Sequence, residues 1–333
     1  MTDTAFKALV ITETDDKQYT RQIMEKRVDD LPPGDVLVQV HYSSLNYKDA
    51  LSASGNKGVT RSYPHTPGID AAGVVVESAD SAFKPGDEVI VTSYDLGMNT
   101  AGGFGQYIRV PAQWVVPLPG GLTLKEAMCY GTAGFTAGLS VFKLVDHGVL
   151  PEHGEVLVSG ATGGVGGIAV AILSKLGYPV VAVNGLVDEA AYLETIGAQR
   201  VISIAEAADQ SGRPLLKTQW SGSIDTVGGD ILATSIKSVS PHGVVTSCGN
   251  VASPDLPLNV FPFILRGITL VGIDSQNCPM PDRLKTWEKL ADEWKIPTME
   301  AVVEEIGLAD LDRSIDRMLK GQHKGRAVVK MKD

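Results

Sequence analysis

The first 125 residues contain short apolar runs that are separated by turn-forming residues. Pro-Gly-Asp turns at residues 33–35 and 85–87 each precede such a run. Runs of this length, rich in valine and isoleucine, predict β strands, and their spacing favours a small β barrel or an irregular β domain. The predicted strands cover residues 6–11, 36–42, 71–77 and 88–91.

From about residue 129 the pattern changes, and apolar runs typical of buried strands alternate with helices that end at glycines. Six strands that alternate with helices predict a doubly wound parallel sheet. In the tail, the pattern predicts an amphipathic helix over residues 282–294 and a strand over 326–330. The six strands are expected at 155–159, 179–183, 200–203, 223–227, 244–247 and 268–273, with helices at 168–176 and 189–196.

The composition narrows the class of protein. Hydrophobic residues make up 44% of the 333 residues, which is enough for packed cores. A net charge of −10, from 29 Lys and Arg against 39 Asp and Glu, argues against nucleic acid as a partner. The three scattered cysteines are too few for a disulfide framework or a four-cysteine zinc site. We expect a cytoplasmic protein without a membrane span, because neither a secretory signal pattern nor a long apolar stretch is present.

A glycine cluster follows the strand predicted at 155–159 and opens the next helix. In this context, glycines let the backbone approach a pyrophosphate, whose charge then lies at the helix N-terminus. The sequence therefore predicts a dinucleotide site at Gly163, Gly164, Val165 and Gly166. A glycine-rich turn without a ligand is the alternative.

The end of the second strand usually distinguishes NAD from NADP, through an acid for a ribose hydroxyl or a base for a 2′-phosphate. This chain has Asn184, Gly185 and Leu186 at that place, with neither an acid nor a base directly at the strand end. Arg200 is the nearest basic candidate to reach a phosphate. The residues alone leave the choice of cofactor open.

Motifs distributed over nearly the whole chain carry a resemblance to a known family. They are residues 44–50 (SLNYKDA), 67–70 (PGID), 131–137 (GTAGFTA), 159–166 (SGATGGVG), 223–228 (SIDTVG), 262–266 (PFILR) and 272–275 (GIDS). With these motifs the chain resembles the medium-chain dehydrogenase/reductase superfamily, and within it the acryloyl-CoA reductase group of quinone-oxidoreductase-like enzymes.

The resemblance implies an α/β protein with two domains. A GroES-like, β-rich catalytic domain is expected over residues 1–128 and is completed by 277–333. A Rossmann domain with a doubly wound parallel sheet is expected over 129–276. The zinc-dependent branch of the superfamily has a catalytic Gly-His-Glu where this chain has Gly68, Ile69 and Asp70, and a four-cysteine lobe that three cysteines cannot make. We predict no metal, and a structural role for the lone His65.

The resemblance also implies NADPH, with its phosphate held by a Ser-Gly-Arg triplet that is replaced here by Asn184, Gly185 and Leu186. The missing arginine removes a bidentate phosphate contact, so use of NADH is a second expectation. Lys320, Lys324 and Arg326 form a basic cluster that would either meet phosphates or lie on a solvated face. The further expected cofactor contacts are Tyr47, Asn250, Ile264, Ser275 and Lys320, of which Asn250 and Ser275 follow the fifth and sixth strands.

Conjugate reduction of an enoyl thioester needs a hydride at the β-carbon and a proton at the α-carbon. The protein must position the substrate, stabilise the enolate and supply that proton. The resemblance points to Tyr47 for contact with the nicotinamide or proton delivery, to Asn46 for orienting it, and to Asp49 for capping the helix expected after it. The alternative is that Tyr47 is an interface aromatic and Asn46 a turn residue.

The expected function is NADPH-dependent reduction of a short 2-enoyl-CoA, with acryloyl-CoA to propanoyl-CoA as the leading reaction. An NAD(P)H quinone or enone reductase on the same scaffold is one alternative, and a nucleotide-binding protein with little turnover is another. The apolar strand at 268–273 is expected to form an edge of the Rossmann sheet. In the family such an edge pairs across a twofold axis, which implies a homodimer.

Overall fold

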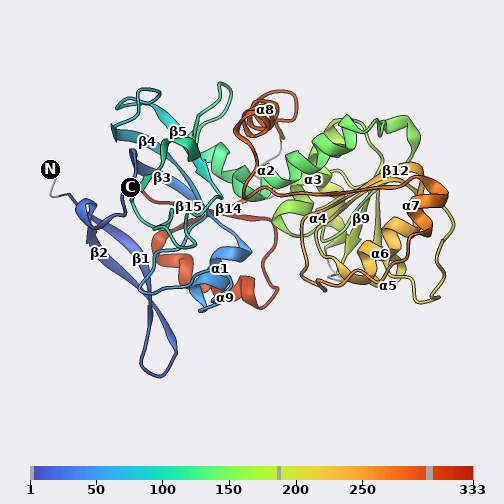
Figure 1. Cartoon of the computed structure of the whole chain (residues 1–333), viewed down its shortest axis with the longest axis horizontal. Coiled ribbons are helices and arrows are strands. Elements are labelled where there is room, and N and C mark those ends of the chain that lie inside the picture. Colours follow the sequence, from blue (N-terminus) through green and yellow to red (C-terminus); the bar gives the residue numbers. More distant parts are fainter. Residues whose placement is uncertain (1–3, 186–188, 298–302, 333) are drawn as a thin grey trace. The chain divides into compact units, whose positions relative to one another are not determined.

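The computed structural model describes residues 4–185, 189–297 and 303–332 (Figure 1). The chain divides into two compact units. The first boundary follows Thr132 rather than residue 128, and the second follows Ser275 rather than residue 276. The first unit is formed by Met1–Thr132, Gln276–Ala291 and Val303–Asp333, and the second by Ala133–Ser275 and Asp292–Val302.

The first unit is built around a seven-stranded sheet in the order β14-β15-β3-β4-β5-β7, with β6 also paired to β3. The C-terminal strand β15 pairs antiparallel with β3, so that Val328 lies opposite Ser44. The last strand of the chain therefore completes the sheet that the N-terminal half begins. The strands are β3 (Val36–Leu45), β4 (Asp70–Ser78), β5 (Glu88–Thr92), β6 (Tyr107–Val110), β7 (Val115–Pro117), β14 (Val303–Gly307) and β15 (Arg326–Lys330).

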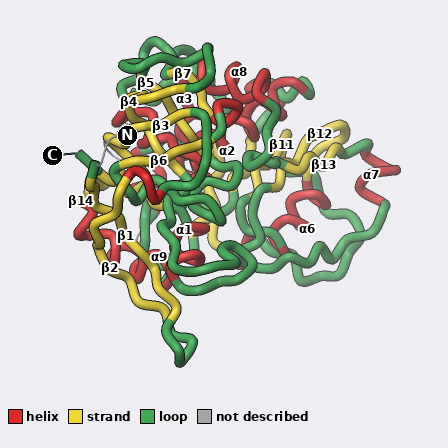
Figure 2. The backbone as a smooth tube through the Cα atoms, turned by 60° about the vertical axis from the view of Figure 1, so that its left-hand side comes forward, coloured by secondary structure: helices red, strands yellow, loops and turns green. Residues whose placement is uncertain are grey.

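Strands β1 (Ala5–Glu13) and β2 (Tyr19–Arg27) form a separate antiparallel pair. In Figure 2 they are seen as a two-stranded ribbon that extends beyond the larger sheet. Strand β2 was not predicted from the sequence, because most of its side chains are polar and exposed, so that it lacks an apolar run.

The helices of the first unit are short, and three of them lie wholly within it. They are α1 (Tyr47–Ala53), α8 (Met280–Ala291) and α9 (Leu311–Leu319). The helix predicted over 282–294 therefore ends at Ala291, and Trp294 lies beyond it, where its ring packs edge-on against Phe142 in the second unit. Among the described residues, short 3-10 turns lie at Val28–Asp30, Ala112–Trp114, Pro151–His153 and Leu308–Asp310.

Helix α2 (Leu124–Asp146) contains the first boundary between the units. Its backbone is not helical at Gly131, where φ is 52° and ψ is −156°. Only glycine adopts this region without strain. Helix α2 was not predicted from the sequence, because its Gly, Ala and Thr residues hide the apolar periodicity on which helix prediction depends.

The second unit contains six strands in the order β10-β9-β8-β11-β12-β13, and all neighbouring pairs are parallel. Counted within this unit, the order is 3-2-1-4-5-6, which confirms the predicted doubly wound sheet. The strands are β8 (Val156–Val158), β9 (Val180–Asn184), β10 (Arg200–Ser203), β11 (Trp220–Asp225), β12 (Val239–Ser247) and β13 (Thr269–Gly272). The helices are α3 (Gly164–Lys175), α4 (Ala190–Thr195), α5 (Ile204–Ala207), α6 (Gly229–Ser238) and α7 (Phe261–Arg266).

In an open sheet of this kind, ligands bind beyond the carboxyl ends of the strands, where the strand order reverses. Here the reversal lies between β8 and β11, which are neighbours in the sheet. The glycine cluster follows β8 and therefore emerges at this place. Among the described residues, none of the helices combines the length and the apolar character that crossing a membrane requires.

Candidate active site

Helix α1 begins at Tyr47, and Asn46 is its N-cap residue. The backbone N–H of Asn46 donates to Asp49 Oδ2 at 2.8 Å, so that Asp49 closes the first turn from inside the helix. Its other oxygen, Oδ1, accepts from the N–H groups of Gly68 and Ile69 at 3.1 and 2.8 Å. From the sequence, Asp49 was expected to cap a helix that follows it. Asp49 instead lies within the helix and fastens it to the start of β4.

Tyr47 is the most exposed of the predicted catalytic residues, with 48% of its surface accessible. As the first residue of α1, it stands directly after a buried N-cap. Within the described part of the chain, its hydroxyl forms no hydrogen bond. The phenol is thus presented by a fixed backbone while its polar end stays free for a ligand.

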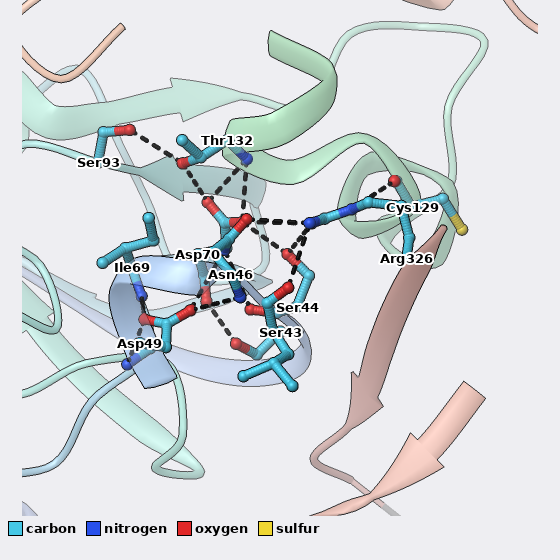
Figure 3. A network of polar contacts seen from close by, with 12 residues as sticks. Ser43, Ser44, Asn46, Asp49, Ile69, Asp70, Ser93, Cys129, Thr132 and Arg326 are labelled. Carbon is cyan, nitrogen blue, oxygen red and sulfur yellow. Dashed lines mark hydrogen bonds and ion pairs between the residues drawn. The ribbon is translucent and has the colours of Figure 1, made fainter. Parts of the chain in front are cut away.

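Asn46 is held at both ends of its side-chain amide (Figure 3). Its Nδ2 donates to Asp70 Oδ2 at 2.7 Å, and its Oδ1 accepts from Arg326 Nη1 at 2.9 Å. These bonds occupy the amide within the protein. Asn46 therefore orients the start of α1.

Asp70 is the centre of a buried polar network (Figure 3). Its Oδ1 accepts from the Thr132 hydroxyl at 2.6 Å, and its Oδ2 accepts from the Ser44 hydroxyl, also at 2.6 Å. The Thr132 N–H lies 2.9 Å from both oxygens. Arg326 Nη2 lies 3.7 Å from Oδ2 and donates to Ser44 Oγ at 2.6 Å. The carboxylate of Asp70, in β4, thus joins this strand to β3, to Thr132 in helix α2 and to the C-terminal strand β15.

The network contains two buried carboxylates, those of Asp49 and Asp70, and one guanidinium, that of Arg326, which is 3% exposed and pairs with Asp70. Burial and the charge of Asp70 raise the pKa of Asp49 to about 7, while the surrounding N–H donors oppose this shift. The buried position of Arg326 rules out the phosphate contact and the solvated face that sequence analysis considered for it.

Sequence analysis missed Asp70, Thr132 and Arg326 as parts of the site. A signal was present, because Asp70 and Arg326 each open an apolar run that forms a strand. A charged residue within a buried strand needs a partner of opposite charge. Pairing these two residues, which are far apart in the sequence, requires knowledge of the fold.

In the second unit, the glycine cluster leads from β8 into α3, whose N-cap is Gly163. Gly164, Val165 and Gly166 are the first three helical residues, so their N–H groups have no acceptor within the helix. A Cβ at Gly166 would lie 2.3 Å from the carbonyl oxygen of Gly160, so glycine is needed for this close packing. A helix N-terminus of this kind can bind an anion, and the dinucleotide site expected here stays a prediction.

A second polar cluster holds the base of this loop. Ser159 Oγ donates to Asp225 Oδ1 at 2.8 Å and accepts from the N–H of Thr226 at 2.9 Å. The N–H of Gly228 donates to Asp225 Oδ2 at 2.8 Å. Ser159 follows β8 and Asp225 ends β11, so this cluster fixes the two strand ends between which the sheet reverses. Sequence analysis assigned these residues no role.

Of the residues predicted to select between NAD and NADP, Asn184 and Gly185 lie at the carboxyl end of a strand, whereas Arg200 lies at the amino end of another. Asn184 is the last residue of β9 and Gly185 follows it in an exposed position, whereas Leu186 lies outside the described residues. Arg200 begins β10 and binds Glu155 at 2.7 Å, with its guanidinium 5.5 Å from the Trp220 ring. This position lies toward the amino ends of the strands and argues against the predicted phosphate contact of Arg200.

The remaining predicted cofactor contacts are spread over the chain. Asn250 lines a groove at the ends of β12 and β13, and Ser275 follows β13 by three residues. Ile264 is 67% exposed on α7. Arg266, at the end of that helix, donates to the carbonyls of Lys237 and Val239 at the amino end of β12, which argues against a cofactor contact for Ile264. Lys320 is exposed at the end of α9, in the first unit.

Comparison with known proteins places the chain in a family. Residues 32–120 match the family described as "Alcohol dehydrogenase GroES-like domain", and residues 164–293 match "Zinc-binding dehydrogenase". The putative quinone oxidoreductase YhfP of Bacillus subtilis is 47% identical, with 91% of this chain and 92% of YhfP covered. The acrylyl-CoA reductase AcuI of Ruegeria pomeroyi is 43% identical, with 97% and 98% covered. The chain belongs to the medium-chain dehydrogenase/reductase superfamily.

Within this superfamily, the chain belongs to the quinone-oxidoreductase-like, acryloyl-CoA reductase group. Solved structures of that group have the same fold. The yhdH oxidoreductase of Salmonella enterica, in complex with NADP, matches with a TM-score of 0.95 and 43% identity over 98% of this chain and all of the other. The B. subtilis yhfP structure, with NAD bound, matches with a TM-score of 0.96 and 44% identity over 98% and 99%.

The residues of this chain do not fit the zinc that the second family description mentions. Ile69 offers no ligand atom at the place of the catalytic histidine, and both oxygens of Asp70 are occupied by hydrogen bonds. His65 Nε2 lies 2.9 Å from the carbonyl oxygen of Gly97, as a structural histidine would. In the described part of the chain, no group of three or more His, Cys, Asp or Glu residues is arranged to hold a metal ion.

Gly131 permits the network around Asp70, and its replacement tests how tightly the network is packed. A Cβ at this position would lie 2.4 Å from Asp70 Oδ2 and 2.6 Å from Arg326 Nη2. We expect Gly131→Ala to lower the free energy of unfolding by about 3 kcal/mol or more, since strain and overpacking add. Chemical denaturation measures this loss.

The matched control for this variant is Gly86→Ala in the same unit. Gly86 also has a positive φ, of 94°, but a Cβ there meets nothing within 4 Å. We expect it to cost only about 1–2 kcal/mol from backbone strain. Equal losses for the two variants would contradict the close packing of the network.

Proposed function

We propose that this oxidoreductase reduces the carbon–carbon double bond of a short 2-enoyl-CoA thioester, with acryloyl-CoA to propanoyl-CoA as its reaction and NADPH as the hydride donor. The observation that carries the proposal is Tyr47, a half-exposed phenol presented by a helix start that a buried network fixes. The likeness to AcuI over nearly the whole chain supports the choice of substrate. The three free cysteines fit the reducing cytoplasm, where we propose that it acts.

In the proposed reaction, acryloyl-CoA, NADPH and one proton give propanoyl-CoA and NADP⁺. The bound cofactor would supply a hydride for the β-carbon of the substrate. The Tyr47 hydroxyl donates a hydrogen bond to the thioester oxygen, where negative charge develops, or transfers its proton to the α-carbon and regains one from water. Asn46 and Asp49 keep the phenol in place through the first turn of α1.

The second unit offers the groups that would hold the cofactor. The free N–H groups of Gly164, Val165 and Gly166 suit a pyrophosphate, because the helix dipole of the 12-residue α3 adds to their attraction for an anion. The groove containing Asn250 lies at the carboxyl ends of two neighbouring strands, which suits the nicotinamide end.

The proposal is tested by the decrease of absorbance at the nicotinamide band with NADPH and acryloyl-CoA, and with 1,4-benzoquinone in parallel. We expect rapid oxidation with the CoA ester. Tyr47→Phe should lower kcat at least about a hundredfold with little change in KM, because a general acid acts only in the transition state. A Tyr47→Phe enzyme of wild-type kcat would remove Tyr47 from the mechanism.

The parallel measurement with 1,4-benzoquinone distinguishes the proposed function from its two alternatives. The name of YhfP favours a quinone or enone reductase as the second candidate, and oxidation with benzoquinone alone would establish it. If neither acceptor is reduced while NADPH binds tightly, the protein is a nucleotide-binding protein with little turnover.

We propose further that the enzyme discriminates weakly between NADPH and NADH. Leu186 stands where the family has an arginine, and Arg200 is engaged with Glu155. We expect KM values for the two cofactors within about tenfold of each other. Leu186→Arg should raise the preference for NADPH by roughly 10- to 100-fold, the effect of one charged phosphate contact.

Arg200→Gln is the control for this measurement, and its KM for NADPH should equal that of the wild type. A large NADPH preference in the wild type would contradict the proposal. If Arg200→Gln abolished that preference, Arg200 would return as the phosphate ligand.

We also propose that the protein is a homodimer joined through the edge strand β13. In the described sheet, β13 pairs only with β12, so its other edge is open. The preceding helix α7 exposes Ile264 and Leu265, which are 67% and 64% accessible. An open edge beside exposed apolar side chains is typical of an interface.

Sedimentation tests the dimer. The wild type should sediment at twice the chain mass of 35.2 kDa at micromolar concentration, and Leu265→Lys should shift it toward the monomer by placing a charge in the interface. Val145→Lys, at an exposed apolar residue of α2, is the control that should leave the dimer intact. A monomeric wild type would refute the proposal.

A further inference from the structure

The chain leaves the first unit after Thr132 and returns to it at Gln276, and both residues are hydrogen-bonded to the same turn of the first unit, Ser93 and Tyr94. Thr132 is the last residue of the first segment, and Gln276 is the residue at which the chain returns. Thr132 is held by Asp70, as described above, and its hydroxyl lies 2.9 Å from that of Ser93. Tyr94, which follows Ser93 in the sequence, donates its N–H to the carbonyl oxygen of Gln276 at 3.2 Å.

The turn formed by Ser93 and Tyr94 has an unusual backbone, with φ of 65° and 50°. Residues other than glycine adopt such angles at a cost of roughly 1–2 kcal/mol each, so the surroundings must hold the turn. The Tyr94 ring stacks on the Trp114 ring. The guanidinium of Arg283 also contacts the Tyr94 ring, at 4.4 Å from the ring centre. Strained turns that the surrounding structure holds so firmly are frequent at functional sites.

Gln276 is also held from α8 and from α1. Arg283 Nη2 donates to its carbonyl oxygen at 3.3 Å, while Arg283 Nη1 binds the carbonyl of Thr92, directly before the turn. The side-chain oxygen of Gln276 accepts from Lys48 Nζ at 2.7 Å. Lys48 follows Tyr47 directly in the sequence. Its ammonium therefore ties the returning chain to the residue next to the proposed proton donor.

We propose that Lys48 is a positioning residue for hydride transfer. By binding Gln276, it fixes the distance between the start of α1, which presents Tyr47, and the returning chain, whose preceding residue is Ser275. Because consecutive Cα atoms are 3.8 Å apart, holding Gln276 also restricts where Ser275 can lie. Ser275 follows the last strand of the sheet and is one of the predicted cofactor contacts. This role rests on the proposed function, since it concerns the geometry of that reaction.

The first test compares Lys48→Met, which keeps the length of the side chain and removes its donor, with Lys48→Arg, which keeps a donor. NADPH is used with whichever of acryloyl-CoA and 1,4-benzoquinone the wild type reduces. We expect Lys48→Met to lower kcat roughly 10- to 100-fold, the effect of a misplacement of about 1 Å. The Kd for NADPH, measured by fluorescence titration, should change less than about threefold, and Lys48→Arg should restore most of kcat.

Two readouts separate positioning from a structural role. With NADPH deuterated at the transferred position, Lys48→Met should show a larger isotope effect on kcat than the wild type, because hydride transfer becomes slower relative to product release. Gln276→Met should reproduce the loss in kcat, and the double variant should be no worse than either single variant, because both remove the same contact.

Lys125→Met is the matched control, since Lys125 forms one exposed ion pair with Glu305 in the same unit. It should leave kcat and the isotope effect unchanged. The inference is overturned if Lys48→Met keeps wild-type kcat, if kcat and NADPH affinity fall together with the melting temperature, or if the two single effects add in the double variant. A wild type that reduces neither acceptor overturns the proposed function itself, and the role of Lys48 with it.

Discussion

The hydrogen bonds that converge on the buried carboxylate of Asp70 are the interaction on which the first unit depends. They bring together four parts of the chain: the end of β3, the start of β4, the break in α2 and the C-terminal strand. A buried charge is costly unless it is paired and hydrogen-bonded, so each of these segments is required by the others. Removing one partner of such a pair typically costs about 3–5 kcal/mol. The same bonds fix Asn46 and hence the direction from which α1 presents Tyr47.

The main features of the fold follow from local pattern. The alternation of buried strands with helices specified the doubly wound sheet, and the strand ends agree with the predictions to within a few residues at most places. The elements that were missed have weak local patterns. Strand β2 is polar and exposed, and α2 is interrupted by a glycine whose conformation depends on side chains from distant segments. Tertiary contacts, rather than propensity, decide such elements.

The site was predictable to the extent that its residues lie in one contiguous motif. Residues 44–50 and the glycine cluster are of this kind. The glycine cluster leads from a strand into a helix as expected, whereas the helix in residues 44–50 begins at Tyr47, before Asp49 rather than after it. The two arginines show the limit. Arg200 was the nearest basic candidate for a phosphate, and it binds Glu155. Arg326 was placed in a basic cluster that would meet phosphates or lie on a solvated face, and it is buried beside Asp70. The partner of a charged residue depends on which strands become neighbours, and that information is spread over the whole chain.

The position of β15 has a consequence for how the protein is made. Arg326, which opens β15, follows Leu45 at the end of β3 by 281 residues in the sequence, yet β15 lies between β14 and β3 within the sheet. The sheet of the second unit comes from one continuous stretch and can form during synthesis, when domains generally fold as units. The first unit must wait with two buried acids unpaired until β15 has left the ribosome. A chain that stops before Arg326 therefore lacks both a central strand and the cation that the interior of the unit requires.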